Sequence, residues 1–250
     1  MRKIATFAAI ALTAAATPAL ADDADGTWTG AYIGISGGYT ETKSDQKVVL
    51  SGQWLTEAAT LQTRVVSDYA TASRVKDINY GGQIGYNVQA GSSLVIGVEA
   101  DVSALSGKNA QTRTSAGTPS YTIANTFDPK VTYSIKGKLG FAAGNTLFYA
   151  TGGWGWTQAD LATDITSNGG YHKASSFSHT FSGYEVGGGL EHRFGRNLSL
   201  RLEYVYADHG DVTYATSYVT GSSFLVPAYN ETFTQDLTMH QVRVGFNYHF

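Results

Sequence analysis

The 250-residue sequence contains no cysteine. This absence excludes disulfide crosslinks, thiol chemistry and cysteine-ligated metal sites. Charged residues are also scarce, because they make up only 15% of the chain, whereas about a quarter is usual in soluble proteins. After the first 21 residues no uninterrupted apolar run reaches the length of about 18 residues that a transmembrane helix needs. The chain therefore has little charge for a water-covered surface and no helix that would cross a membrane.

The first 21 residues have the pattern of a secretory signal peptide. A short basic start, 1–3, precedes an apolar stretch of small residues, 4–16, and Ala19-Leu20-Ala21 matches the A-x-A cleavage pattern. We therefore predict a signal peptide at 1–21, export through the Sec pathway and a single mature domain at 22–250. The whole chain has 20 acidic and 17 basic residues, so no basic excess indicates a nucleic acid partner.

Apolar and polar residues alternate in eight segments of the mature chain. Alternation with a period of two is typical of a β-strand whose two faces meet different surroundings. Each segment has at least the roughly 9–11 residues that a tilted membrane-crossing strand requires. The predicted strands are 29–40, 77–88, 94–104, 131–143, 147–157, 181–194, 198–208 and 238–250.

The connections between these segments alternate in length. Three are short and rich in Gly, Asn and Ser, at 89–93, 144–146 and 195–197. Four are long and polar, at 41–76, 105–130, 158–180 and 209–237. This alternation predicts an all-β fold: an eight-stranded antiparallel transmembrane β-barrel with short periplasmic turns and long extracellular loops. Within the first long connection, 48–50 and 64–66 are candidates for extending the flanking strands above the membrane.

The mid-strand charges of each predicted strand share one face. Repeated glycines lie on the same face, as a narrow lumen requires, and the opposite face lacks Lys and Glu. We therefore predict that the apolar face meets lipid and the charged face lines the lumen. In 147–157 the preferred register points Phe148, Trp154 and Trp156 outward. The predicted lumen charge network comprises Glu99, Asp101, Lys136, Lys138, Glu185, Glu191, Arg201, Glu203 and Arg243.

Aromatic residues gather near the strand ends, where they suit the two girdles at the membrane interfaces. They are Trp28, Tyr39, Tyr80, Tyr86, Trp154, Trp156, Phe194, Tyr206, Tyr248 and Phe250. The charge network has two interpretations. Either paired charges and water fill the lumen, since eight strands enclose little more than side chains, or the charges line a narrow ion path.

Three stretches resemble the RopB-like small outer-membrane proteins of alphaproteobacteria. They are GAYIGISGGY at 30–39, LFYATGGWGW at 147–156 and the final strand that ends on Phe250. That family is part of the wider group of eight-stranded barrels related to the membrane domain of outer-membrane protein A. The resemblance implies an envelope protein and surface antigen of the cell outer membrane. It also implies that Phe250 is the assembly signal read by the barrel assembly machinery.

Some relatives in this family bind hemin. Imidazole and tyrosinate groups both ligate heme iron, and three histidines fall in or beside the predicted long loops among tyrosines. His172, His179 and His209 are therefore candidate hemin ligands, although loop histidines are usually only solvated side chains. No other cofactor and no metal site is expected.

The sequence favours a structural and surface role in the outer membrane, with extracellular loops on display and no open diffusion pore. A small ion channel or porin-like protein is one alternative, and a hemin-binding surface receptor is another. No enzymatic activity is expected, because neither an H-E-x-x-H nor a G-x-S-x-G motif occurs. The expected partners are outer-membrane lipid, lipopolysaccharide and the barrel assembly machinery, while the sequence does not indicate a partner for the loops.

Overall fold

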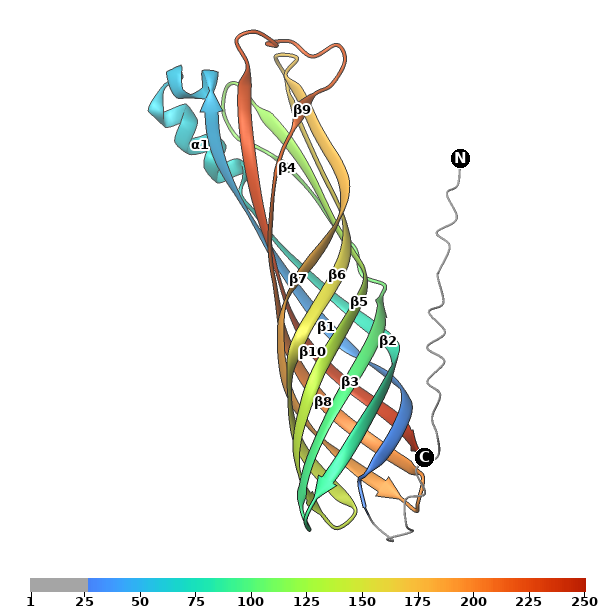
Figure 1. The fold of residues 1–250 in the computed structure, drawn as a ribbon. Coiled ribbons are helices and arrows are strands. Elements are labelled where there is room, and N and C mark those ends of the chain that lie inside the picture. The colour runs from blue at the N-terminus through green and yellow to red at the C-terminus, as the bar shows by residue number, and fades with distance from the viewer. Residues whose placement is uncertain (1–26) are drawn as a thin grey trace.

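A computed structural model describes residues 27–250, so the predicted signal peptide at 1–21 lies outside the described residues. Eight long antiparallel strands form the body of the protein (Figure 1). They are β1 (Gly30–Gly52), β2 (Thr71–Ala90), β3 (Leu94–Leu105), β5 (Tyr121–Ala143), β6 (Thr146–Ser167), β7 (His172–Phe194), β8 (Leu198–Ala215) and β10 (Tyr229–His249).

The sheet closes on itself. β1 pairs with β2 on one side and with β10 on the other, from Tyr32↔His249 to Gly52↔Tyr229, and β3 pairs with β5. A closed sheet has no free edge, so backbone groups find partners without water, as a membrane requires. The predicted eight-stranded antiparallel barrel is confirmed.

Tight turns join β2 to β3, β5 to β6 and β7 to β8 at one end of the barrel (Figure 1). Gly91, Gly144 and Gly195 adopt positive φ angles of 66°, 59° and 75° in these turns. Only glycine adopts such angles at little cost, which explains its place there. Among residues 27–250, none of the helices has the length and hydropathy needed to cross a membrane.

The strands extend well beyond their predicted ends. The structure forms strand over much of the four segments that were predicted as loops, at 41–76, 105–130, 158–180 and 209–237. The period of two continues in these parts with Ser, Thr and Asp on the outer face, because water replaces lipid there. Residues 48–50 extend β1 as predicted. The prediction for 64–66 was wrong, since these residues belong to helix α1 (Ala59–Tyr69), which follows the 3-10 helix η1 (Gln53–Thr56).

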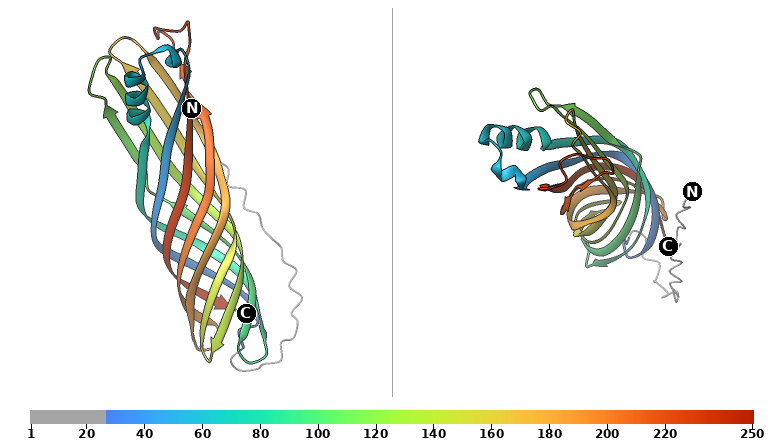
Figure 2. Two further views of the ribbon diagram at one scale, coloured as in Figure 1. Left: turned by 90° about the vertical axis from the view of Figure 1, so that its left-hand side faces the viewer. Right: turned by 90° about the horizontal axis from the view of Figure 1, so that it is seen from above.

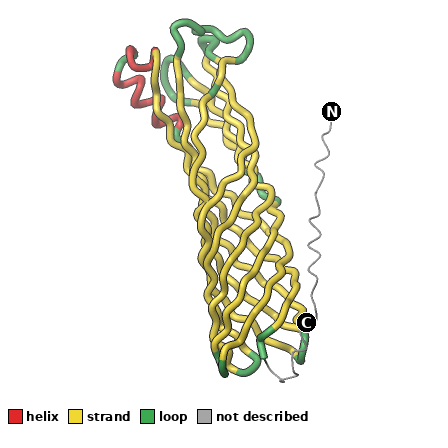
Figure 3. Tube along the Cα trace, viewed as in Figure 1, coloured by secondary structure: helices red, strands yellow, loops and turns green. Residues whose placement is uncertain are grey.

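The barrel wall opens into two sheets in its extracellular half (Figures 2 and 3). Pairing between β2 and β3 ends at Asn79↔Leu105, and pairing between β7 and β8 ends at Tyr184↔Asp208. Above these points β4 (Asn109–Thr114) pairs with β5, and β9 (Ser217–Tyr218) pairs with β7. One upper sheet is therefore β2–β1–β10–β8, and the other is β4–β5–β6–β7.

The two faces of the wall have the predicted polarity. Apolar side chains are exposed along the outer face of the lower barrel, for example Ile35 at 69% and Phe246 at 50%. Phe148 and Trp154 point outward and Trp156 is half-buried, which confirms the preferred register of β6. The prediction that Trp28 belongs to an interfacial girdle was wrong. Its ring is fully buried inside the periplasmic end, 4.3 Å from the Arg193 guanidinium.

Candidate functional site: the lumen and the extracellular chamber

All nine residues of the predicted charge network lie buried inside the barrel. Two arginines bridge acids of β3 and β8, strands on opposite sides of the barrel, at its centre. Arg201 Nη1 donates to Glu99 Oε2 at 2.7 Å, and Arg201 Nη2 lies 2.7 Å from Glu203 Oε2. Arg243 Nη1 donates to Asp101 Oδ1 at 2.8 Å, and Arg243 also bonds Glu203. Ion pairs from β3, β8 and β10 therefore cross the lumen rather than line its wall.

Two lysines of β5 complete the central part of the network. Lys136 Nζ lies 2.8 Å from Asp101 Oδ2, and Lys138 Nζ donates to Glu99 Oε2 at 3.2 Å. The Tyr32 hydroxyl on β1 also donates to Glu99, at 2.6 Å. Desolvated charges are tolerated only when they are paired and hydrogen-bonded in this way.

Two acids of β7 lie in separate groups. Glu191 accepts from Asn247 Nδ2 at 2.8 Å and lies 3.0 Å from His249 Nε2, at the periplasmic end. Glu185 lies 3.2 Å from His209 Nε2, nearer the extracellular side. The nine predicted residues thus form one central group with Glu185 and Glu191 on either side of it.

An apolar layer covers the charges on their extracellular side. The inward residues of β10 change from polar to apolar toward the extracellular side. Arg243 and Gln241 come first, and Met239 and Leu237 lie above them. Both apolar side chains are fully buried. The layer consists of Val75, Leu105, Phe127, Ala159, Leu161, Phe181, Ala207, Leu237 and Met239. Charges and apolar layer therefore fill successive levels of the barrel interior.

A second polar centre lies above this layer, in an extracellular chamber between the two upper sheets, and sequence reasoning missed it. Glu231 accepts from Trp54 Nε1 at 2.6 Å, Lys173 Nζ at 2.7 Å and Thr216 Oγ1 at 3.1 Å, and also from the Tyr171 hydroxyl. Burial, together with the nearby carboxylate, raises the pKa of Tyr171. The signal was available, because Glu231 continues the inward parity of β10 beyond the predicted strand.

A cavity of about 170 Å³ opens beside this centre. Aromatic rings of Trp54, Tyr121, Tyr171 and Tyr229 line it together with the carboxylate of Glu57. The Tyr229 hydroxyl donates to Glu57 Oε1 at 2.6 Å, and this hydrogen bond raises the pKa of Tyr229 to about 12. The chamber is therefore a packed aromatic core rather than a set of solvated loops.

The three candidate hemin ligands do not share a site. His179 and His172 are seven residues apart on β7, about 23 Å along the strand, and point to opposite faces. His209 is buried, with Nδ1 2.9 Å from Thr157 Oγ1. His179 and His209 lie within strands and not in loops, whereas His172 is the first residue of β7 and so lies beside a loop, as predicted. Hemin binding stays a prediction without a common ligand set.

Phe250 lies against the first strand. Its backbone N–H donates to the Ala31 carbonyl at 3.0 Å, and its ring is 75% exposed beside Tyr248. The ring is accessible from outside the barrel. Its role as an assembly signal stays a prediction.

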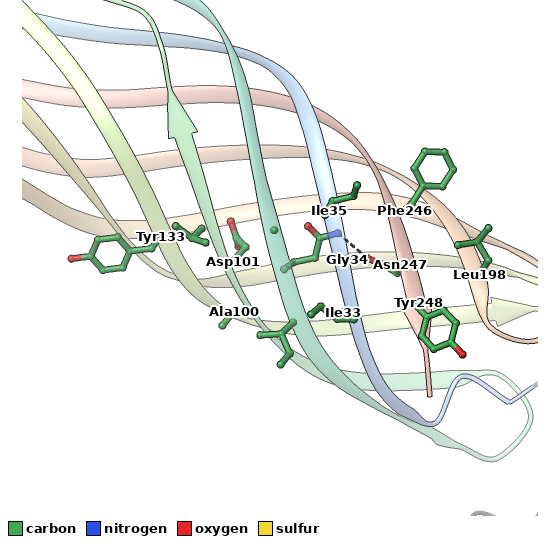
Figure 4. A pocket seen from close by; sticks show the side chains of 14 residues that line it. Ile33, Gly34, Ile35, Ala100, Asp101, Tyr133, Leu198, Phe246, Asn247 and Tyr248 are labelled. Atoms are coloured by element: carbon green, nitrogen blue, oxygen red, sulfur yellow. Dashed lines mark hydrogen bonds between the residues drawn. The ribbon is translucent and has the colours of Figure 1, made fainter. Parts of the chain in front are cut away.

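A wide hollow lies on the outer wall (Figure 4). It has a volume of about 1220 Å³ and crosses β1, β2 and β3 on the lipid-facing side, with further lining residues from β5, β8 and β10. Ile33, Ile35, Ile84 and Val102 line it, and Gly82 leaves its floor without a side chain.

The chain is similar to several known outer-membrane proteins. The "31 kDa outer-membrane immunogenic protein" of Brucella melitensis is 27% identical over 237 residues, which cover 90% of this chain and 84% of the relative. The "22 kDa outer membrane protein" of Rhizobium leguminosarum bv. viciae is 30% identical over 137 residues, 54% of this chain and 55% of the relative. The crystal structure of OprG from Pseudomonas aeruginosa covers 90% of this chain and 99% of its own, with 12% identity and a TM-score of 0.46.

Residues 7–250 match the family described as "Outer membrane protein beta-barrel domain". This match spans nearly the whole sequence and agrees with the closed sheet and its apolar outer face. The protein is therefore an outer-membrane protein, and its chain belongs to the outer-membrane β-barrel family.

Proposed function

We propose that this protein is a closed structural barrel of the outer membrane that displays a rigid extracellular extension and has no open diffusion pore. The observation that carries the proposal is the filled interior. Arg201 and Arg243 join acids across the lumen, and the apolar layer lies directly above them. An ion that enters from either side meets a desolvated ion-pair network or an apolar constriction, and both oppose conduction.

The extracellular half suits display on the cell surface. Its strands continue past the apolar band, and Trp54 and Tyr69 pack in its core. At the tip, between β9 and β10, Leu225 and Val226 are 53% and 89% exposed. The Brucella relatives are named immunogenic outer-membrane proteins, and exposed tips on a rigid support would serve as epitopes in the same way. No catalytic step is part of this proposal.

Planar-bilayer recording of purified, folded protein tests the closed lumen. The wild-type protein should give no steady conductance. A variant without the two bridging arginines and two large apolar side chains (Arg201→Ser, Arg243→Ser, Phe127→Ala and Phe181→Ala) should conduct if it folds, as shown by heat-dependent mobility on a gel. Steady ion currents from wild-type monomers would overturn the proposal and favour a small channel.

Surface display is tested separately with an epitope tag. A tag inserted between Gly221 and Ser222, in the loop between β9 and β10, should bind antibody on intact cells. A tag in the turn between β7 and β8, at Gly195, is the matched control and should bind only after the outer membrane is permeabilised. Equal binding of both tags on intact cells would contradict the proposed orientation.

A further inference from the structure

Four cations lie together on the outer wall, just above the apolar band. This basic patch comprises Lys43 on β1, Arg74 and Lys76 on β2, and Lys108 in the connection between β3 and β4. Arg74, Lys76 and Lys108 are exposed, and Lys43 is half-buried. Within residues 27–250, none of the four makes an ion pair.

The strand register places the basic patch at the upper edge of the lipid-facing surface. Tyr39 pairs with Ile78, and both are exposed apolar side chains. Lys76 is the next outward residue of β2 after Ile78, and Arg74 follows it, directly opposite Lys43. The cations therefore begin about 7 Å along the strand from the last exposed aliphatic side chain.

Three acids lie nearby, and none of them forms an ion pair with the basic patch in the described structure. Glu41 is opposite Lys76 in the register but forms no ion pair with it in the described structure. Both carboxylate oxygens of Asp77 accept hydrogen bonds, from Ile78 N and from the Ser106 and Gly107 backbone. Asp45, the next outward residue of β1 after Lys43, is exposed and forms no ion pair in the described structure, so four cations face three acids on this wall.

The rest of the outer surface at this level has the opposite charge. Lys130, the one lysine on the outer face of β5 and β6, is paired with an aspartate. Six outward aspartates lie on β5, β6, β8 and β10: Asp128, Asp160, Asp164, Asp208, Asp211 and Asp236. A chain with a net charge of −3 therefore concentrates unpaired positive charge on one wall, and this wall complements an anion.

The outer hollow lies below the basic patch on β1 and β2. Gly82 in its floor is six residues from Lys76 along β2, about 20 Å along the tilted strand and so about 15 Å deeper in the membrane. Acyl chains of one leaflet reach the part of the hollow around Gly82, since the hydrocarbon core is about 30 Å thick. The opposite end of the hollow, at Leu198 and Tyr248, lies near the periplasmic end of the barrel. Cations at the surface and an apolar hollow beneath them match an anionic lipid.

We propose that the wall formed by β1, β2 and β3 binds lipopolysaccharide, the phosphorylated glycolipid of the outer leaflet. Its phosphates contact the basic patch, where Arg74 and the three lysines supply charge-assisted hydrogen bonds. An acyl chain occupies the hollow beside Ile35, Ile84 and Val102. The binding does not depend on whether the lumen conducts.

The experiment measures the affinity of purified protein in detergent for lipopolysaccharide and for the same lipid after its phosphates are removed. The triple variant K43Q/R74Q/K76Q should bind intact lipopolysaccharide at least about tenfold more weakly, because each cation contributes to binding of an anionic headgroup. The control R64Q/R113Q/K130Q removes the same number of positive charges outside the wall of β1, β2 and β3 and should bind as the wild type does. Dephosphorylated lipid should bind all three proteins with the same low affinity.

An equal loss of affinity for intact lipopolysaccharide in both triple variants, or no loss of affinity in either, would overturn the assignment of the site. The wild-type protein could also bind a sulfated polysaccharide as tightly as lipopolysaccharide and lose this binding in K43Q/R74Q/K76Q. That result would reassign the basic patch to a surface polysaccharide and also overturn the proposal. Ala100→Phe fills the hollow without changing charge and should weaken binding of intact lipopolysaccharide. An unchanged affinity in that variant would overturn the acyl-chain contact. Heat-dependent gel mobility confirms that each variant is folded.

Discussion

At the residue scale, Glu99 is the centre of the lumen network because donors from three strands converge on its carboxylate. Tyr32, Lys138 and Arg201 all donate to it. Removing one partner of a buried ion pair leaves the other partners charged and desolvated, which costs about 3–5 kcal/mol.

We therefore expect Glu99→Gln to lower the free energy of unfolding by about 3 kcal/mol or more. The control Glu41→Gln removes a carboxylate that forms no ion pair in the described structure and should change it by less than about 1 kcal/mol. Urea unfolding in phospholipid vesicles measures both. Similar unfolding midpoints for the two variants would show that the network does not stabilise the barrel.

Glycine on the inner face permits close approach of neighbouring strands. A Cβ on Gly38 would lie 2.0 Å from the Val242 carbonyl oxygen, whereas a Cβ on the adjacent Gly37, which faces lipid, would meet nothing closer than 3.6 Å. Gly38→Ala must push backbone apart at the closing β1–β10 seam, at a cost of about 1–3 kcal/mol.

Gly38→Ala should therefore yield less of the compact, unheated band on a gel than the wild type, while Gly37→Ala should match the wild type. The two variants add the same methyl group one residue apart. If both fold equally well, the inward glycine is not required by packing.

Tyr229 provides a titratable marker of the extracellular chamber. Its hydrogen bond to Glu57 raises its pKa to about 12, above the usual value of about 10. A raised pKa means that folding favours the protonated phenol, so the protonated Tyr229 hydroxyl contributes to the stability of the folded protein. This contribution to stability is therefore full below about pH 10 and is lost as pH rises through about 12.

Glu57→Gln removes the charge of the acceptor and should shift one tyrosine titration back toward pH 10. Ultraviolet difference titration of the variant against the wild type measures the shift. The shift should be absent when the same comparison is made in a Tyr229→Phe background. A shift that persists in the Tyr229→Phe background belongs to another tyrosine and would contradict the assignment of the raised pKa to Tyr229.

At the element scale, the sequence predicts the membrane-crossing strands better than what lies above them. The lipid-facing parity of 238–250 and 94–104 is clear, since apolar side chains occupy every second position over 242–250 and 94–104 and the charged residues lie only between them. The extensions of β1 and β10 carry polar residues on both faces, so the alternation of apolar and polar residues no longer separates strand from loop. The lumen residues followed from parity alone, whereas the Glu231 centre depends on pairing between strands distant in sequence.

Helix α1 shows the same limit. It begins without a side-chain cap and has no acid in its first turn and no base in its last, so the usual signals of helix ends are missing. Packing of Val65 and Tyr69 against Trp54 and Phe233 holds it in place. Tertiary contacts, which no local pattern displays, therefore determine this element.

Replacing 53–69 with a Gly-Ser linker of equal length should loosen the extracellular half and leave the membrane ring intact. The loss of three buried side chains from the aromatic core opens that half to protease. Limited proteolysis with heat-dependent gel mobility measures both halves. The same kind of replacement at 220–226, an exposed loop, is the control and should leave the protease resistance of the rest of the protein unchanged. Loss of the compact band when 53–69 is replaced would contradict the independence of the membrane ring.

At the scale of the whole molecule, the barrel has two zones that differ in pairing. In the lower zone every strand has two neighbours, so backbone exchange with water requires the ring to open. In the upper zone the sheets part between β2 and β4 and between β7 and β8. The amide side chains of Asn109 and Gln111 cross the first gap to the carbonyls of Arg74 and Ala72, at 3.2 and 3.3 Å. These bridges replace backbone pairing there.

This difference predicts the pattern of amide hydrogen exchange. Residues 175–183 of β7 pair only with β6, so amides that point toward β8 lack a backbone partner. Residues 232–236 of β10 lie at a comparable level but largely pair with both β1 and β8. Alternate amides of the β7 segment should therefore exchange at least about tenfold faster than those of the β10 segment. Uniform protection of both segments would mean that the upper barrel is closed in solution and that the two sheets do not part.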